Sequence, residues 1–221
     1  AVRAFYKYLL CKNVVEANPA MEVETAKVPK RLPDCVKMEN VERLFDKAER
    51  GDDFEEVRDR LIMLMLFTTG IRRGELVGLR DRDVSANELK VHGKRNKDRI
   101  VPFGPELSEE IANYRAIRAA QVGETEMFFV RSNGEAVYPT LVYRLVHKEL
   151  SEVGGCSRYS PHVLRHTFAS AMLNNGAQLN SVKELLGHES LAATQVYTHI
   201  THRELKSNYE HAHPRALKKG G

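Results

Sequence analysis

The chain has 221 residues, of which 42% are hydrophobic, and it carries a net charge of +4. No apolar run approaches the roughly 18 residues of a membrane span, and three cysteines without CxxC spacing exclude a disulfide framework and a zinc ribbon. We therefore expect a cytoplasmic globular protein with a sizeable core and no membrane anchor. The small positive charge is by itself weak evidence for a nucleic-acid partner.

The N-terminal segment AVRAFYKYLLCK has helical periodicity, and a stretch with two prolines and several basic residues follows it up to Pro33. We expect residues 1–20 to be the last helix of a truncated N-terminal domain and residues 21–35 to be a linker. Residues 36–221 then form the main domain, with a C-terminal helix.

The next segments alternate between helical and strand patterns. VERLFDKAER and FEEVRDRLIMLMLFTT predict helices, the second stopped by Gly70, and RRGELVGLR predicts another. Residues 88–92 and 99–103 predict a hairpin whose tip, GKRNKD, is strongly basic.

The second half of the chain is mostly helical in pattern. MFFV, at residues 127–130, reads as a short strand, and helices are expected at 105–121, 139–152, 161–174, 180–187, 190–197 and 202–212. The predicted fold class is therefore mainly α with a small antiparallel β-sheet.

The segment SPHVLRHTFASAML places His162, Arg165 and His166 on one face of a helix that is otherwise apolar. Such a cationic cluster beside a core calls for an anion. The structural alternative is a capped helix, with Ser160 at the N-cap, Pro161 at the first helical position, and histidines bound to the backbone.

Four segments, TGIRRGEL, GKRNK, HVLRH and LLGHESLAATQVYTH, together resemble the tyrosine recombinase (phage integrase) family from about Lys30 to Arg215. The matching positions are Arg72, Lys94, His162, Arg165, His188 and Tyr197. His188 follows Arg165 by 23 residues and precedes Tyr197 by 9, as in Xer-type members. The linker PKRLP and the ending HAHPRA also look most like Xer recombinases.

The resemblance implies a tyrosine recombinase catalytic-domain fold, with residues 1–20 as the end of a core-binding domain. It implies that Tyr197 attacks a DNA phosphate, that Arg72 and Arg165 stabilise the charge that develops there, and that His188 assists them. His162 would accept the tyrosine proton, and Lys94 would protonate the leaving 5′ oxygen, with Lys97 as the alternative.

The remaining polar residues of these segments receive supporting roles. Arg73, Arg95, Lys97 and Arg99 are expected to contact DNA phosphates, while Glu75 and His166 are expected to support the site within the fold. The implied mechanism needs no metal and no cofactor, because guanidinium groups stabilise the phosphate charge.

The implied partners are a double-stranded DNA recombination site and other recombinase subunits, in a homo- or hetero-tetramer joined by exchange of the C-terminal helix. Docking of that helix within its own chain is the alternative. The implied function is Xer-like resolution of chromosome dimers by a cytoplasmic, nucleoid-associated enzyme.

Three other functions remain open at this point. The first is an integrase or transposase of a phage or mobile element, and the second is a DNA-binding protein of the same fold that does not cleave. The third is a zinc protein that uses Cys156, His162 and His166, for which no clear fourth ligand is present.

Overall fold

The structure is a computed structural model that describes residues 2–23, 35–45, 51, 53–93, 98–155, 158–187, 207 and 209–215. The chain divides into two compact units, residues 1–32 and 33–221, and each is described by itself. In the first unit, α1 (Val2–Cys11) precedes the 3-10 helix η1 (Pro19–Met21). Most of the predicted linker, residues 24–34, lies outside the described residues.

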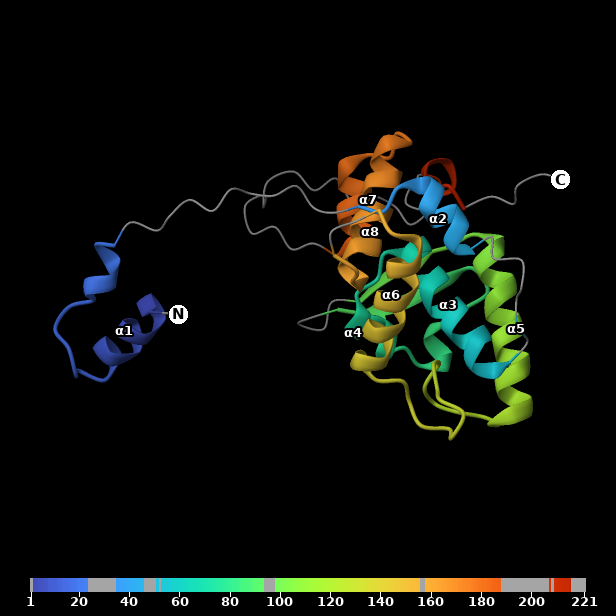
Figure 1. The fold of residues 1–221 in the computed structure, drawn as a ribbon, viewed down its shortest axis with the longest axis horizontal. Helices are drawn as coiled ribbons and strands as arrows, with labels where there is room; N and C mark the ends of the chain where they lie inside the picture. Colours follow the sequence, from blue (N-terminus) through green and yellow to red (C-terminus); the bar gives the residue numbers. More distant parts are fainter. Residues whose placement is uncertain are drawn as a thin grey trace. The chain divides into compact units, whose positions relative to one another are not determined.

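The second unit is mainly helical, with one two-stranded antiparallel sheet (Figure 1). This confirms the predicted fold class. Its elements in chain order are α2 (Met38–Phe45), α3 (Phe54–Thr69), α4 (Arg73–Val77), η2 (Asp81–Asp83), β1 (Glu88–His92), β2 (Asp98–Pro102), α5 (Pro105–Gln121), α6 (Pro139–Val153), α7 (Pro161–Asn174) and α8 (Leu179–Leu186).

Helix α3 is the central helix of this unit and packs against α5 and α7 (Figure 1). Every residue from 61 to 70 is buried, as expected for a helix that is apolar on all sides. Its start is capped by the Asp53 carboxylate, which accepts a 3.1 Å hydrogen bond from the Glu55 backbone N–H. Its end is Gly70, in the left-handed conformation at φ +61°, so the predicted stop is confirmed.

The hairpin pairs β1 with β2 in the register that the alternating pattern requires. Leu89 lies opposite Val101 and Val91 lies opposite Arg99, and the three aliphatic side chains are buried. Strand β2 begins at Asp98, one residue before the predicted start. The basic tip, residues 94–97, lies outside the described residues.

Two predicted elements differ from the structure. The MFFV segment forms isolated bridges rather than a strand: Met127 pairs with Arg80, and Val130 pairs with Ala136. The helix predicted over RRGELVGLR is limited to α4, because the chain leaves the helix after Gly78 and pairs Arg80 with Met127. The predicted helix at 190–197 lies outside the described residues.

The described end of the predicted 202–212 helix packs against its own domain. Residues 209–212 are helical, and Tyr209, Ala212 and His213 are buried. The His213 ring lies 5.4 Å from the Phe67 ring and 5.4 Å from the Phe168 ring. Burial lowers the pKa of His213 to about 3, so this ring is neutral at ordinary pH.

Within the part of the chain that the structure describes, no helix is long and apolar enough to cross a bilayer.

Candidate active site

The first part of the site is the turn that joins α3 to α4. At Gly70 an added Cβ would lie 2.5 Å from a ring carbon of Phe168, so both the backbone conformation and the packing require glycine. The Arg72 backbone N–H then donates a 2.7 Å hydrogen bond to Oε2 of Glu75. This contact satisfies a free amide at the start of α4 and holds Arg72 beside the end of α3.

Two arginines share the carboxylate of Glu75. Nη1 of Arg72 lies 2.8 Å from Oε1, while Nη1 and Nη2 of Arg99 lie 3.0 and 2.8 Å from Oε1 and Oε2. Arg99 comes from β2, so the carboxylate joins the hairpin to α4. Burial alone would raise the pKa of Glu75, but hydrogen bonds from Arg99 and Arg72 outweigh it and lower the pKa to about 2.

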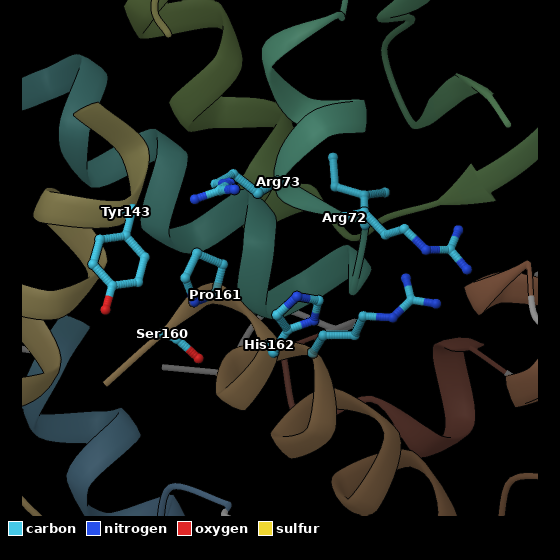
Figure 2. Close-up of a pocket in the computed structure, with 8 residues that line it drawn as sticks. Arg72, Arg73, Tyr143, Ser160, Pro161 and His162 are labelled. Atoms are coloured by element: carbon cyan, nitrogen blue, oxygen red, sulfur yellow. The ribbon is translucent and has the colours of Figure 1, made fainter. Parts of the chain in front are cut away.

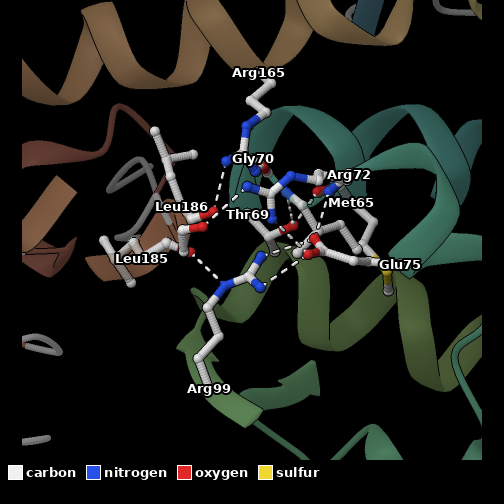
Figure 3. Close-up of polar contacts among 11 residues, drawn as sticks. Met65, Thr69, Gly70, Arg72, Glu75, Arg99, Arg165, Leu185 and Leu186 are labelled. Carbon is white, nitrogen blue, oxygen red and sulfur yellow. Dashed lines mark hydrogen bonds and ion pairs between the residues drawn. The ribbon is translucent and has the colours of Figure 1, made fainter. Parts of the chain in front are cut away.

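Three successive carbonyl oxygens at the end of α8 each accept a hydrogen bond from a different arginine (Figure 3). Nε of Arg99 donates to Leu185 at 2.8 Å, Nη2 of Arg165 to Leu186 at 2.5 Å, and Nη2 of Arg72 to Gly187 at 2.9 Å. Carbonyls at a helix C-terminus lack partners within the helix and carry partial negative charge, so cations stabilise them. We call Arg72, Arg99 and Arg165 the arginine cluster.

Arg165 is the most enclosed member of the cluster, with 6% of its surface exposed. Its Nη1 also donates a 2.6 Å hydrogen bond to the Gly70 carbonyl, which ties α7 to the end of α3. Burial, followed by the positive charge of Arg72, lowers the pKa of Arg165 to about 10. The guanidinium is therefore still charged at neutral pH.

The arginine cluster carries more positive charge than the carboxylate paired with it in the described part of the chain. Among the described residues, Arg72 and Arg99 share the carboxylate of Glu75, whereas Arg165 donates to two carbonyl oxygens, which supply only partial charge. The cluster therefore attracts an anion from solvent.

A pocket of about 220 Å³ lies beside the cluster, as Figure 2 shows. Arg72 and Arg165 line it together with His162, which is exposed at the start of α7. Arg72 and Arg73 extend in opposite directions from successive positions. The pocket is lined by Ile71, Arg72, Arg73, Tyr143, Ser160, Pro161, His162 and Arg165.

The structure brings together three residues that the sequence places in one site: Arg72, His162 and Arg165. Arg73 lines the same pocket, and Glu75 supports Arg72 from within the fold. The other predicted catalytic and DNA-binding residues, Lys94, Arg95, Lys97, His188 and Tyr197, lie outside the described residues.

The geometry of Arg99 differs from its predicted role as a phosphate contact. Its side chain is 12% exposed, and Nε, Nη1 and Nη2 all donate to groups within the molecule. The guanidinium therefore faces Glu75 and the end of α8 instead of solvent. The reason is the register of β2, which aims Arg99 at α4 and the end of α8.

The two structural expectations for α7 have different outcomes. Ser160 and Pro161 occupy the N-cap and first helical positions, although the Ser160 side chain makes no capping hydrogen bond. His166 is exposed, and its predicted supporting role stays a prediction. Among the described residues no three His, Cys, Asp or Glu side chains form a metal-binding group, and Cys156 lies outside them.

Sequence reasoning missed several parts of this site. The carbonyl oxygens of Gly70, Leu185, Leu186 and Gly187 have no signature in side-chain patterns, although their position at helix ends is a usable signal. Tyr143 enters the pocket from α6, and nothing in the sequence indicates that α6 borders α7 at this point.

A mainly helical domain that aims two arginines and a histidine from distant segments at one pocket is the arrangement expected of a tyrosine recombinase. Comparison with known proteins agrees. The Phage integrase family model matches residues 35–204. Tyrosine recombinase XerC of Chlorobaculum tepidum is 39% identical over 240 residues, covering 98% of this chain and 71% of that protein.

Two solved structures give the same result. The crystal structure of XerA recombinase is 29% identical, with a TM-score of 0.64, over 97% of this chain and 73% of that one. XerH site-specific recombinase, solved bound to palindromic difH substrate as a post-cleavage complex, is 25% identical with a TM-score of 0.65, over 84% of this chain and 55% of that one. The chain belongs to the phage integrase family and is a tyrosine site-specific recombinase of the Xer type.

Proposed function

We propose that this chain cleaves and rejoins double-stranded DNA at a specific site through a 3′-phosphotyrosyl intermediate, in Xer-like recombination of chromosomal DNA. The observation that carries the proposal is the shared pocket of Arg72 and Arg165. Both guanidinium groups are already fixed by carbonyl oxygens of α8, so little reorganisation is needed when a phosphate enters.

The two arginines suit the charge that forms during cleavage. When the phenolic oxygen of Tyr197 bonds to phosphorus and the bond to the 5′ oxygen breaks, negative charge is spread over the nonbridging oxygens. A guanidinium donates two parallel hydrogen bonds to a phosphate, and its charge does not titrate near neutral pH. Arg72 and Arg165 thus stabilise the transition state more than the bound substrate.

Two proton transfers complete the step. His162 accepts the proton of Tyr197, and support for this role comes from its exposed position at the pocket. Lys94, at the hairpin tip, donates a proton to the departing 5′ oxygen, with Lys97 as the alternative donor. The product is a phosphotyrosyl bond and a free 5′ hydroxyl, and attack by a 5′ hydroxyl reverses both transfers.

His188 is proposed to donate a further hydrogen bond to the same phosphate. It directly follows Gly187 in the chain, and the Gly187 carbonyl accepts from Arg72. Arg73, exposed at the pocket, and the tip residues Arg95 and Lys97 are proposed to contact neighbouring phosphates.

The proposed partners are duplex DNA and further recombinase subunits, in a homo- or hetero-tetramer in the cytoplasm, at the nucleoid. The XerH relative was solved on its DNA substrate, which supports a DNA partner here. Residues 1–20 are proposed to be the end of a core-binding domain. In the proposed tetramer the C-terminal helix is exchanged, which would require Tyr209 and His213 to leave the surface they occupy in cis.

The direct test is covalent capture. Duplexes that become covalently attached to the wild-type chain are selected from a random-sequence library. The selected duplex is then nicked beside the cleavage position, so that the short fragment with the free 5′ hydroxyl diffuses away and cannot be rejoined. We expect a protein–DNA band with wild type and none with Tyr197→Phe. If no duplex gives a covalent product with wild type, or if Tyr197→Phe forms it equally well, the proposal is wrong.

A further inference from the structure

All three guanidinium nitrogens of Arg99 donate hydrogen bonds within the protein. Its three nitrogens make three hydrogen bonds of 2.8 to 3.0 Å, one to a backbone carbonyl and two to one carboxylate. A fork held in this way lacks the freedom to follow a DNA backbone. Its role must therefore be found in what it holds.

The first group that Arg99 holds is the carboxylate of Glu75. Each oxygen of this carboxylate accepts one hydrogen bond from Arg99 and one from Arg72, whose donors are the backbone N–H and Nη1. The bidentate pair with Arg99 fixes the plane of the carboxylate, and that plane sets the direction of the Arg72 side chain. Arg99 thus orients Arg72 through Glu75.

The second group that Arg99 holds is the last turn of α8. Its Nε donates to the Leu185 carbonyl, and its side chain lies against Gly187, where an added Cβ would be 3.1 Å from Nη1. Gly187 is at φ +61° and ends the helix. The next residue in the chain is His188, so Arg99 supports the turn from which the His188 segment leaves.

We propose that Arg99 is a positioning residue for strand cleavage, which links the hairpin strand to Arg72 through Glu75 and to the end of α8 through the Leu185 carbonyl. This inference rests on the proposed function. Arg99 touches no DNA in this role. Lysine cannot replace it, because an ammonium group cannot contact both carboxylate oxygens and the carbonyl in one planar arrangement.

The low pKa of Glu75 supports the same role and supplies a specific readout. With Arg99 present, the pKa of the Glu75 carboxyl is about 2, so this group stays charged at neutral and mildly acidic pH. Without the hydrogen bonds from Arg99, the effect of burial raises this pKa. Loss of Arg99 should therefore make cleavage fall more strongly at acidic pH than it does in the wild type.

The first experiment needs no DNA. Hydrogen exchange is followed in the whole chain for wild type, Arg99→Lys, Arg99→Gln and the control Arg82→Lys, in which an exposed arginine of η2 is changed. We expect faster exchange in peptides spanning α4 and the end of α8 for both Arg99 variants, with exchange in α5 unchanged. Equal exchange at α4 and α8 in wild type and Arg99→Lys would overturn the inference.

The second experiment separates binding from cleavage, with the captured duplex as the probe. For Arg99→Lys we expect single-turnover cleavage about 10- to 100-fold slower, as for lost supporting contacts in other sites. DNA affinity and its salt dependence should be unchanged, and cleavage should fall more strongly at acidic pH than that of Arg82→Lys. Arg99→Gln should behave in the same way.

The possible results are distinguishable. If Arg99→Lys weakens DNA binding and lowers the salt slope by about one unit while leaving saturated cleavage intact, Arg99 is a phosphate contact and the inference is wrong. A uniform fall in stability with an unchanged pH profile also contradicts it. Failure of the wild type to form any covalent product refutes the proposed function, whereas hydrogen exchange still decides whether Arg99 holds α4 and α8.

Discussion

The Arg165 guanidinium donates a 2.6 Å hydrogen bond to the Gly70 carbonyl oxygen, so a side chain of α7 binds the residue that ends α3. The same guanidinium lines the pocket and reaches the end of α8. The position of the proposed phosphate-binding group therefore depends on a glycine whose only contribution is its backbone.

Gly70→Ala tests this dependence. Alanine would have to adopt the positive φ of Gly70, and its Cβ would lie 2.5 Å from the Phe168 ring and 3.0 Å from Leu186. We therefore expect a loss of roughly 2–4 kcal/mol of unfolding free energy. The control is Gly123→Ala, since Gly123 also has a positive φ but nothing within 4 Å of an added Cβ. Urea unfolding should show a clearly smaller loss for the control; equal losses would contradict the packing argument.

The pKa of Glu75 predicts a dependence of stability on acid. Its folded-state pKa of about 2 lies below the ordinary 4.5, so its contribution is fully present above pH 4.5 and is lost as the pH falls toward 2. Glu75→Gln should remove at most about 3 kcal/mol at neutral pH and flatten the pH dependence in that window. Urea unfolding at several pH values measures both, with the exposed Glu124→Gln as control. A wild-type slope retained in Glu75→Gln would contradict the assignment.

His92 predicts a dependence of the opposite sign. Its Nδ1 lies 2.8 Å from Oδ1 of Asp98 and its Nε2 lies 3.2 Å from Oδ1 of Asp83, and hydrogen bonds to these carboxylates raise its pKa above 6.5. Lys90, 3.2 Å from Oδ2 of Asp98, is the nearby cation on the same hairpin.

Because the folded-state pKa of His92 is raised, its contribution is fully present below pH 6.5 and is lost as the pH rises through the folded value. Stability of the wild type measured from pH 5.5 to 8.5 should fall more steeply than that of His92→Gln. His147→Gln, on the exposed face of α6, serves as the matched change. Parallel stability curves for wild type and His92→Gln would show that the charge on His92 adds nothing to stability through Asp98 and Asp83, and would contradict the prediction.

The end of α3, the start of α7 and the hairpin were predictable from the sequence, because Gly70, Pro161 and the alternating strand pattern act locally. The positions Arg72, His162 and Arg165 came from the resemblance to the family. The role of Arg99 was not predictable, since a spacing of 24 residues from Glu75 says nothing about the fold that brings them together. Likewise, the helical pattern of residues 202–212 predicts a C-terminal helix but not the surface on which it docks. MFFV has the composition of a strand, but its first and last residues each form one isolated bridge and no strand pairs along it. The packing of Phe128 and Phe129 against Tyr114 therefore decides its conformation.

Removal of residues 202–221 tests the C-terminal segment. Because Tyr209 and His213 are buried in cis, we expect a loss of about 3–5 kcal/mol, as for removal of a buried aromatic side chain. Cooperative assembly on a paired DNA site, followed by native gel shift, should also be lost if the helix is exchanged between subunits. The control is a chain that lacks only residues 216–221. Normal assembly by the chain that lacks residues 202–221 would rule out exchange.

The central claim is that Arg72 and Arg165 bind one scissile phosphate and neutralise its developing charge. The most direct measurement compares cleavage of the captured duplex with that of the same duplex carrying a neutral methylphosphonate at the scissile position. On the phosphate, Arg72→Ala and Arg165→Ala should each cleave at least about 100-fold more slowly than wild type. On the methylphosphonate, which has one less negative charge to stabilise, the account predicts that these defects shrink markedly. Equal defects on both duplexes would contradict it.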